Sequence, residues 1–78
     1  MSKYIVSELE MITNICPTQW EGRTLDGLMF YARYRWGGLS VDIGGNQIFY
    51  KNYNDPFHGV MSTNTMMQLT SEIITYHI

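Results

Sequence analysis

Two arginines, two tyrosines and a tryptophan lie within the six-residue segment YARYRW at 31–36. Guanidinium groups bind phosphate and carboxylate through paired hydrogen bonds. Aromatic rings stack on bases or anchor protein interfaces, and Tyr, Trp and Arg dominate the binding energy of such interfaces. The segment therefore predicts a surface that binds an anionic ligand or partner. The competing interpretation is an ordinary strand whose arginines are solvated and pair with neighbouring carboxylates.

The elements that would position these side chains are the strands of a meander. Glycine-containing turn signals at residues 26–27, 37–38 and 44–46 separate segments of β-forming residues. Connections this short make sequential strands antiparallel neighbours. We expect four strands near residues 19–24, 28–36, 39–43 and 47–51.

Side chains of a strand alternate between its two faces. In 28–36, one face would carry Leu28, Phe30, Ala32, Tyr34 and Trp36 as core residues. A Gly37-Gly38 turn would pair Trp36 with Leu39 in the core. The same register pairs Arg33 with Asp42 and Arg35 with Ser40 on the open face, and Arg33 would then form a cross-strand ion pair.

The next hairpin extends both faces. A Gly45-Asn46 turn would pair Val41 with Tyr50 on the core side. On the open side it would pair Asp42 with Phe49 and Ser40 with Lys51. The open face would therefore hold arginines, a lysine and two aromatic rings.

The first hairpin allows two registers. A two-residue Asp26-Gly27 loop would place Trp20 beside Arg33 on the open face, but it would bury Glu21 and Arg23 at a cost. A three-residue loop of residues 25–27 instead places Trp20 in the core and turns Glu21 and Arg23 outward. We favour the three-residue loop and keep Trp20 among the candidates. The candidate binding residues are Trp20, Arg23, Tyr31, Arg33, Arg35, Asp42, Phe49 and Lys51.

Helical patterns flank the meander. The capping-box sequence at residues 7–10 and apolar residues at helical spacing predict a helix over residues 7–15, with a strand through Tyr4–Val6 as the alternative. Ser62, Thr63 and Asn64 are candidate N-caps of a second helix that runs to about residue 75. A last strand within residues 73–78 is the alternative there. The predicted fold is a single α+β domain, residues 1–78: a four-stranded antiparallel meander flanked by a short N-terminal helix and a C-terminal helix packed on one face.

The composition excludes several functions. The net charge is −2, which argues against general nucleic-acid binding. No apolar segment is long enough to cross a membrane, and the N-terminus lacks the pattern of a secretory signal. Cys16 has no partner for an internal disulfide, so we expect a buried thiol and a cytoplasmic protein. A core this small is marginal, so we expect a homo-oligomer.

The residues give no basis for catalysis. His58 and His77 are far apart, and the loop pair Asp55 and His58 lacks further ligands for a metal. No nucleophile–base arrangement and no phosphate-binding loop occurs. We expect no enzyme activity, no cofactor and no metal.

The stretch from Cys16 to Val41 resembles small uncharacterised proteins of phages and other mobile elements. Their pattern is roughly Pro-x-Gln-Trp-Glu-Gly, then Asp-Gly, then Tyr-x-Arg-Tyr-Arg-x-Gly-x-Leu. The matching positions are Trp20, Glu21, Gly22, Asp26, Gly27, Tyr31, Arg33, Tyr34, Arg35 and Gly37. No activity comes with this resemblance. It implies a setting: small non-catalytic phage proteins often act by binding, including against host immunity, and the compartment would be the cytoplasm of an infected bacterium.

Two functions fit that setting. The first is a binding protein that sequesters a small anionic nucleotide signal through the arginines and aromatic rings of the open face. The second is a protein-binding inhibitor, similar to an anti-CRISPR protein, that blocks a host effector complex.

Overall fold

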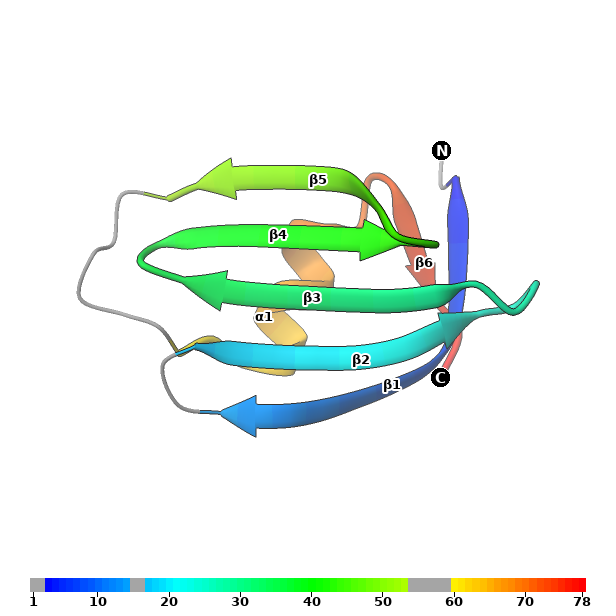
Figure 1. The fold of residues 1–78 in the computed structure, drawn as a ribbon, viewed down its shortest axis with the longest axis horizontal. Coiled ribbons are helices and arrows are strands. Elements are labelled where there is room, and N and C mark those ends of the chain that lie inside the picture. The colour runs from blue at the N-terminus through cyan, green and yellow to red at the C-terminus, as the bar shows by residue number, and fades with distance from the viewer. Residues whose placement is uncertain (1–2, 15–16, 54–59) are drawn as a thin grey trace.

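A six-stranded sheet curls around one short helix (Figure 1). This computed structural model describes residues 3–14, 17–53 and 60–78. The strand order in the sheet is β5-β4-β3-β2-β1-β6. The elements are β1 (Tyr4–Asn14), β2 (Thr18–Thr24), β3 (Met29–Arg35), β4 (Gly38–Ile43), β5 (Asn46–Asn52), α1 (Thr63–Leu69) and β6 (Ile74–Tyr76).

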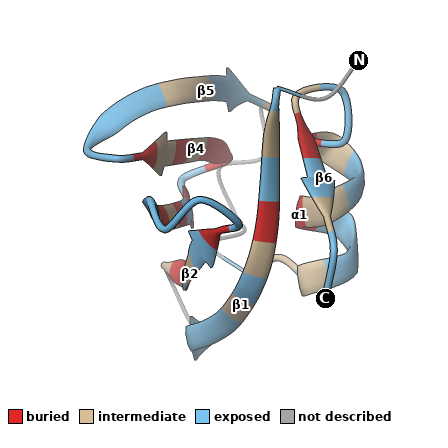
Figure 2. Cartoon of the chain, turned by 90° about the vertical axis from the view of Figure 1, so that its right-hand side faces the viewer, coloured by how far each residue is buried: buried red, intermediate tan, exposed pale blue. Residues whose placement is uncertain are grey.

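The core lies between the sheet and α1. Strands β1 to β5 follow one another as antiparallel neighbours, and β6 pairs with the start of β1 in the parallel sense. Figure 2 shows buried segments on the strands and on the helix that they enclose. The buried apolar residues are Val6, Trp20, Phe30, Ala32, Tyr34, Leu39, Val41, Ile43, Met66 and Ile74. One face of the sheet therefore packs on α1, and the opposite face is open.

The predicted N-terminal helix over residues 7–15 is wrong, because the chain from Tyr4 to Asn14 forms β1. A register shift between Val6 and Glu8 interrupts the alternation of faces. As a result, Val6 and Leu9 both contact the core although they are three residues apart, a spacing that imitates a helix. Pairing with β2 then outweighs the local capping-box signal.

The C-terminal prediction is partly right. The side chain of Ser62 caps α1 by accepting a hydrogen bond from the Thr65 backbone N–H (3.1 Å). However, the helix ends at Leu69 rather than near residue 75. The alternative of a last strand holds for Ile74–Tyr76, which pairs with Tyr4–Val6 at the edge of β1.

The fold is therefore mostly sheet, and the predicted four-stranded meander with two helices is wrong. The central meander exists as expected, but strands at both ends of the chain extend it to six. The described residues contain one helix instead of two. Cys16 and the loop at residues 54–59, with Asp55 and His58, lie outside the described residues.

A glycine allows the sheet to curl where β1 and β2 approach each other closely. Gly22 lies opposite Leu9, and a Cβ atom added to Gly22 would overlap the backbone carbonyl oxygen of Glu8. Only glycine permits this approach of the two backbones. The bend of β1 that follows is visible in Figure 2.

Candidate functional site: the open face and the β3–β4 turn

The β2–β3 hairpin has the three-residue loop that we favoured. The Thr24 backbone N–H donates to the Leu28 carbonyl (2.9 Å), so residues 25–27 form the loop, and Gly27 adopts φ +89°. Trp20 lies opposite Ala32 and is fully buried. Trp20 is therefore a core residue and not part of a binding surface.

The β3–β4 hairpin turns one residue earlier than predicted. Arg35 pairs with Gly38, so Trp36 and Gly37 form the turn with φ values of +53° and +79°. The pairing of β3 with β4 is shifted by two residues from the predicted register. Because side chains alternate with a period of two, the residues of both strands keep their predicted faces. The shift moves Trp36 from its predicted core position to an exposed turn, where 61% of its surface is accessible.

The same shift separates the predicted ion pair. Arg33 lies opposite Ser40, and Asp42 lies opposite Tyr31. Within the part of the chain that the structure describes, neither Arg33 nor Arg35 forms an ion pair. Both guanidinium groups are therefore available to a ligand or partner.

The β4–β5 hairpin corrects two further candidates. The turn is Gly44-Gly45, and a register shift between Val41 and Asp42 pairs Val41 with Phe49 and Ser40 with Tyr50. Phe49 packs against the core, whereas Tyr50 lies on the open face with 57% of its surface exposed. The predicted positions of Phe49 and Tyr50 are therefore exchanged. The extra residue of the bulge, which the alternation rule did not include, causes the exchange.

Lys51 is exposed but does not belong to the open face. It lies opposite the buried residue Leu39, so its side chain lies on the face of edge strand β5 that is turned toward α1. Of the eight candidates, the structure places five on the open face and three elsewhere. Those on the open face are Arg23, Tyr31, Arg33, Arg35 and Asp42; those elsewhere are Trp20, Phe49 and Lys51.

Charge is unevenly distributed on the open face. One row across the strands places the carboxylates of Glu10, Glu21 and Asp42 in line with Tyr31. Glu8 and Arg23 form the next pair beyond that row. In the opposite direction, Arg33 lies between Gln19 and Ser40, and Arg35 follows beside the turn. Carboxylates thus flank Arg23, whereas the nearest residues across from Arg33 and Arg35 are neutral.

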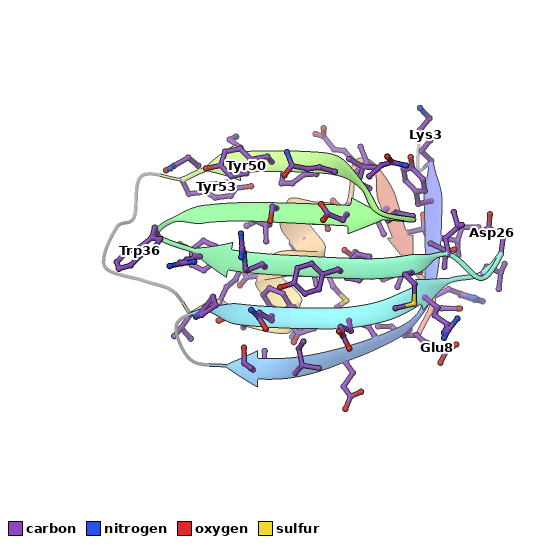
Figure 3. All side chains as sticks on the ribbon, in the orientation of Figure 1. Lys3, Glu8, Asp26, Trp36, Tyr50 and Tyr53 are labelled. Carbon is purple, nitrogen blue, oxygen red and sulfur yellow. The ribbon has the colours of Figure 1, made fainter. Side chains whose placement is uncertain are left out.

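Aromatic rings gather at the end with the free arginines. Figure 3 shows Trp36, Tyr50 and Tyr53 at the same end of the sheet. The Arg35 guanidinium carbon lies 5.9 Å from the centroid of the Trp36 ring, and the Lys51 ammonium lies 5.4 Å from that of Tyr53. We call the six residues Arg33, Arg35, Trp36, Tyr50, Lys51 and Tyr53 the turn end.

Backbone contacts hold the turn end together. The Tyr53 backbone N–H donates to the Gly37 carbonyl (2.7 Å), which fastens the end of β5 to the turn. The Tyr50 ring covers Gly38 so closely that a Cβ there would lie 2.8 Å from the tyrosine oxygen. Burial raises the pKa of the Tyr53 phenol above its usual 10.

Three residues of the turn end were missed as binding residues. The alternation of faces predicts Trp36 and Tyr50 to be core residues, and no sequence pattern singles out Tyr53. A tryptophan directly before two glycines is a signal that it could occupy the turn itself. For Tyr50 no signal was available, because its face depends on a bulge that the sequence does not reveal.

Two hollows lined by described residues lie away from the turn end. One of about 390 Å³ is lined by Glu8, Leu9, Glu10, Glu21, Gly22, Arg23 and Met29. The other, of about 270 Å³, is lined by Lys3, Tyr4, Ile5, Leu25 and Asp26. Neither includes a residue of the turn end. Among the described residues, no cluster of His, Cys, Asp or Glu could hold a metal ion.

Comparisons with protein-family models, with curated proteins and with solved structures give no match for this chain. The helix in the described residues is too short to cross a membrane. What the structure offers for function is therefore the geometry of the turn end.

Proposed function

We propose that this chain is a non-catalytic binding protein that inserts its turn end into an acidic cleft of a partner protein. The observation that carries the proposal is the state of Trp36: its ring is exposed, its φ is +53°, and the Arg35 guanidinium lies over the ring. A left-handed backbone costs a non-glycine residue about 1 kcal/mol. Such strain is concentrated at functional sites.

The residue types fit a protein partner. Trp, Tyr and Arg are the commonest hot-spot residues of protein interfaces, and three of the six turn-end residues carry a positive charge. Acidic groups around a cleft would pair with Arg33, Arg35 and Lys51. In the setting that the sequence resemblance implies, the partner is a host defence protein.

The shape favours a protein over a nucleotide. Small ligands bind in concave sites that enclose most of their surface. The β3–β4 turn lies at one end of the longest axis (Figure 1), and the two hollows described above are formed by other residues. A hairpin end with an exposed ring instead matches a cleft in a larger molecule.

Binding experiments with matched variants test the proposal. Tagged wild-type chain, Trp36→Asn, Arg35→Ala and Arg23→Ala are each used for capture from a bacterial lysate, and a captured protein is then purified and titrated by calorimetry. Wild type and Arg23→Ala should bind the purified partner alike, because Arg23 lies among carboxylates away from the turn end. Trp36→Asn and Arg35→Ala should each weaken binding at least tenfold.

A panel of nucleotides tests the alternative function, in which the chain sequesters a nucleotide signal. Cyclic dinucleotides and ADP-ribose derivatives are added to the chain while its melting temperature is measured. We expect no increase. A rise of several degrees that Arg35→Ala abolishes would contradict the proposal and favour the sequestration of a nucleotide signal.

A further inference from the structure

Apolar side chains are exposed at the end of the sheet opposite the turn end. The exposed fractions are 42% for Ile5, 66% for Leu25, 42% for Leu28 and 52% for Met29. These are four of the ten large hydrophobic residues exposed in the described part of the chain. Single exposed apolar residues are ordinary, but several at one end mark a contact surface.

Hydrogen bonds place these residues together. The Leu25 backbone N–H donates to the Ile5 carbonyl (2.8 Å), which joins the β2–β3 loop to β1. The Leu28 backbone N–H donates to the Thr24 hydroxyl (2.9 Å) at the base of the same loop. Ile5 and Leu25 therefore lie together and form the centre of one apolar end. Leu28 extends this end toward the β4–β5 turn, where its side chain lies beside Gly44, and Met29 follows on the open face.

Opposite charges flank the hollow in this apolar end. Tyr4, Ile5 and Leu25 line the hollow of about 270 Å³, together with Lys3 and Asp26. Both charged side chains are exposed, and they form no ion pair among the described residues. A cation and an anion beside one apolar hollow are complementary in charge to a second copy of the same surface. A twofold axis at this end would allow Lys3 of each copy to pair with Asp26 of the other.

We propose that two copies of this chain associate through the apolar end, with Ile5 and Leu25 at the centre and two Lys3–Asp26 pairs at the rim. The occupant is a second copy because the surface supplies equal numbers of each charge around its apolar centre. A core of this size is also marginal, and association adds apolar burial.

This dimer leaves the turn end free and does not depend on the proposed function. The β2–β3 and β3–β4 turns lie at opposite ends of the longest axis, which measures 35 Å (Figure 1). Two associated copies would therefore present two turn ends that point away from each other. A dimer could engage two partner molecules, or two sites on one assembly, and gain avidity.

Sedimentation equilibrium and light scattering across the micromolar range test the proposal. The wild type should reach twice the chain mass of 9.1 kDa as concentration rises. Leu25→Glu should remain at the chain mass, because it buries two carboxylates at the axis. Circular dichroism should match the wild type, because Leu25 is exposed in the single chain.

Charge exchange tests the twofold arrangement. Lys3→Glu and Asp26→Lys should each weaken association about tenfold, since each variant opposes like charges at two places. The double variant Lys3→Glu/Asp26→Lys should recover most of the lost affinity. Asp26→Asn keeps an acceptor for the Thr24 hydroxyl (2.5 Å) and separates the effect of charge from that of loop structure.

Three outcomes would overturn the proposal. The wild type could stay at the chain mass throughout, the double variant could associate no better than the single ones, or Leu25→Glu could dimerise like the wild type. Dimerisation that Trp36→Asn abolishes and Leu25→Glu preserves would assign the interface to the turn end instead. None of these outcomes decides whether the turn end binds a partner protein.

Discussion

The indole N–H of Trp20 donates a hydrogen bond to the hydroxyl of Thr63 (3.0 Å), which joins the middle of β2 to the first residue of α1 across 43 positions of the sequence. Trp20 is fully buried, so this bond gives the only polar atom of its side chain a partner inside the core. A second bond lies nearby, from the Met61 backbone N–H to the Thr18 hydroxyl (3.1 Å). Together these two bonds fix the start of α1 on the sheet.

Removing the acceptor from Thr63 should destabilise the fold. Thr63→Val keeps the shape of the side chain but leaves the Trp20 N–H buried without a partner, so the free energy of unfolding should fall by about 2 kcal/mol. Thr63→Ser retains the hydroxyl and is the matched control. Urea unfolding followed by tryptophan fluorescence measures both. Equal stability of the two variants would show that the hydrogen bond does not matter.

Gly22→Ala should disturb the close pairing of β1 and β2. The added methyl group would overlap the Glu8 carbonyl oxygen, and the backbones must separate, at a cost of about 3 kcal/mol. Gly45→Ala is the control: no atom lies within 4 Å of its added methyl group, and only its φ of +84° opposes alanine. That variant should lose about 1 kcal/mol. Thermal unfolding that ranks the two variants in the reverse order would refute this account of the curl.

Trp36→Asn should stabilise the protein while it weakens binding. Asparagine followed by glycine is the preferred sequence for a two-residue turn with both φ values positive, so the free energy of unfolding should rise by about 1 kcal/mol. Chemical denaturation of the two chains measures this gain. A loss of stability would mean that the Trp36 ring supports the fold. The case for a binding role would then disappear.

The stability of the protein at alkaline pH should depend on the ionisation of Tyr76. Burial raises the pKa of its phenol to about 12, against the opposing effect of its hydrogen bond with Thr70 (2.7 Å). The folded state therefore holds the phenol proton more tightly than the unfolded state does. The resulting stabilisation is complete below pH 10 and declines as pH rises from 10 to about 12.

Tyr76→Phe supplies the comparison. This variant cannot ionise at residue 76, so its free energy of unfolding should fall less steeply between pH 10 and 12 than that of the wild type. Tyr53 remains and contributes a smaller decline in the same direction, since burial also raises its pKa. Denaturant titrations at several pH values measure the slopes. Parallel slopes would argue against a buried phenol at residue 76.

Several features could be predicted from neighbouring residues. The alternation of Phe30, Ala32 and Tyr34 identified the core face of β3, and the cost of burying Glu21 and Arg23 selected the three-residue β2–β3 loop. Five of the eight candidate site residues lie on the open face for the same reason. These predictions depended on the period of a strand and on burial, both of which are local.

The position of the β3–β4 turn could not be predicted in this way. Local preference favours Gly37-Gly38, but in the structure Gly38 is needed in β4, where the Tyr50 ring lies against its backbone. Trp36 therefore enters the turn despite its unfavourable φ. The residues that form the turn end were consequently assigned to the wrong places, although the arginines were on the correct face.

The sequence by itself determined which side chains of the central strands face the core, where the last helix begins, and that Arg33 and Arg35 share the open face. Only the tertiary structure decided that the first segment is a strand, that Arg33 lies opposite Ser40, and that Trp36 is exposed. The reason is physical. Alternation depends on the pleat of a single strand, whereas register depends on bulges and on contacts such as that of Tyr50 with Gly38, which form only when distant strands meet.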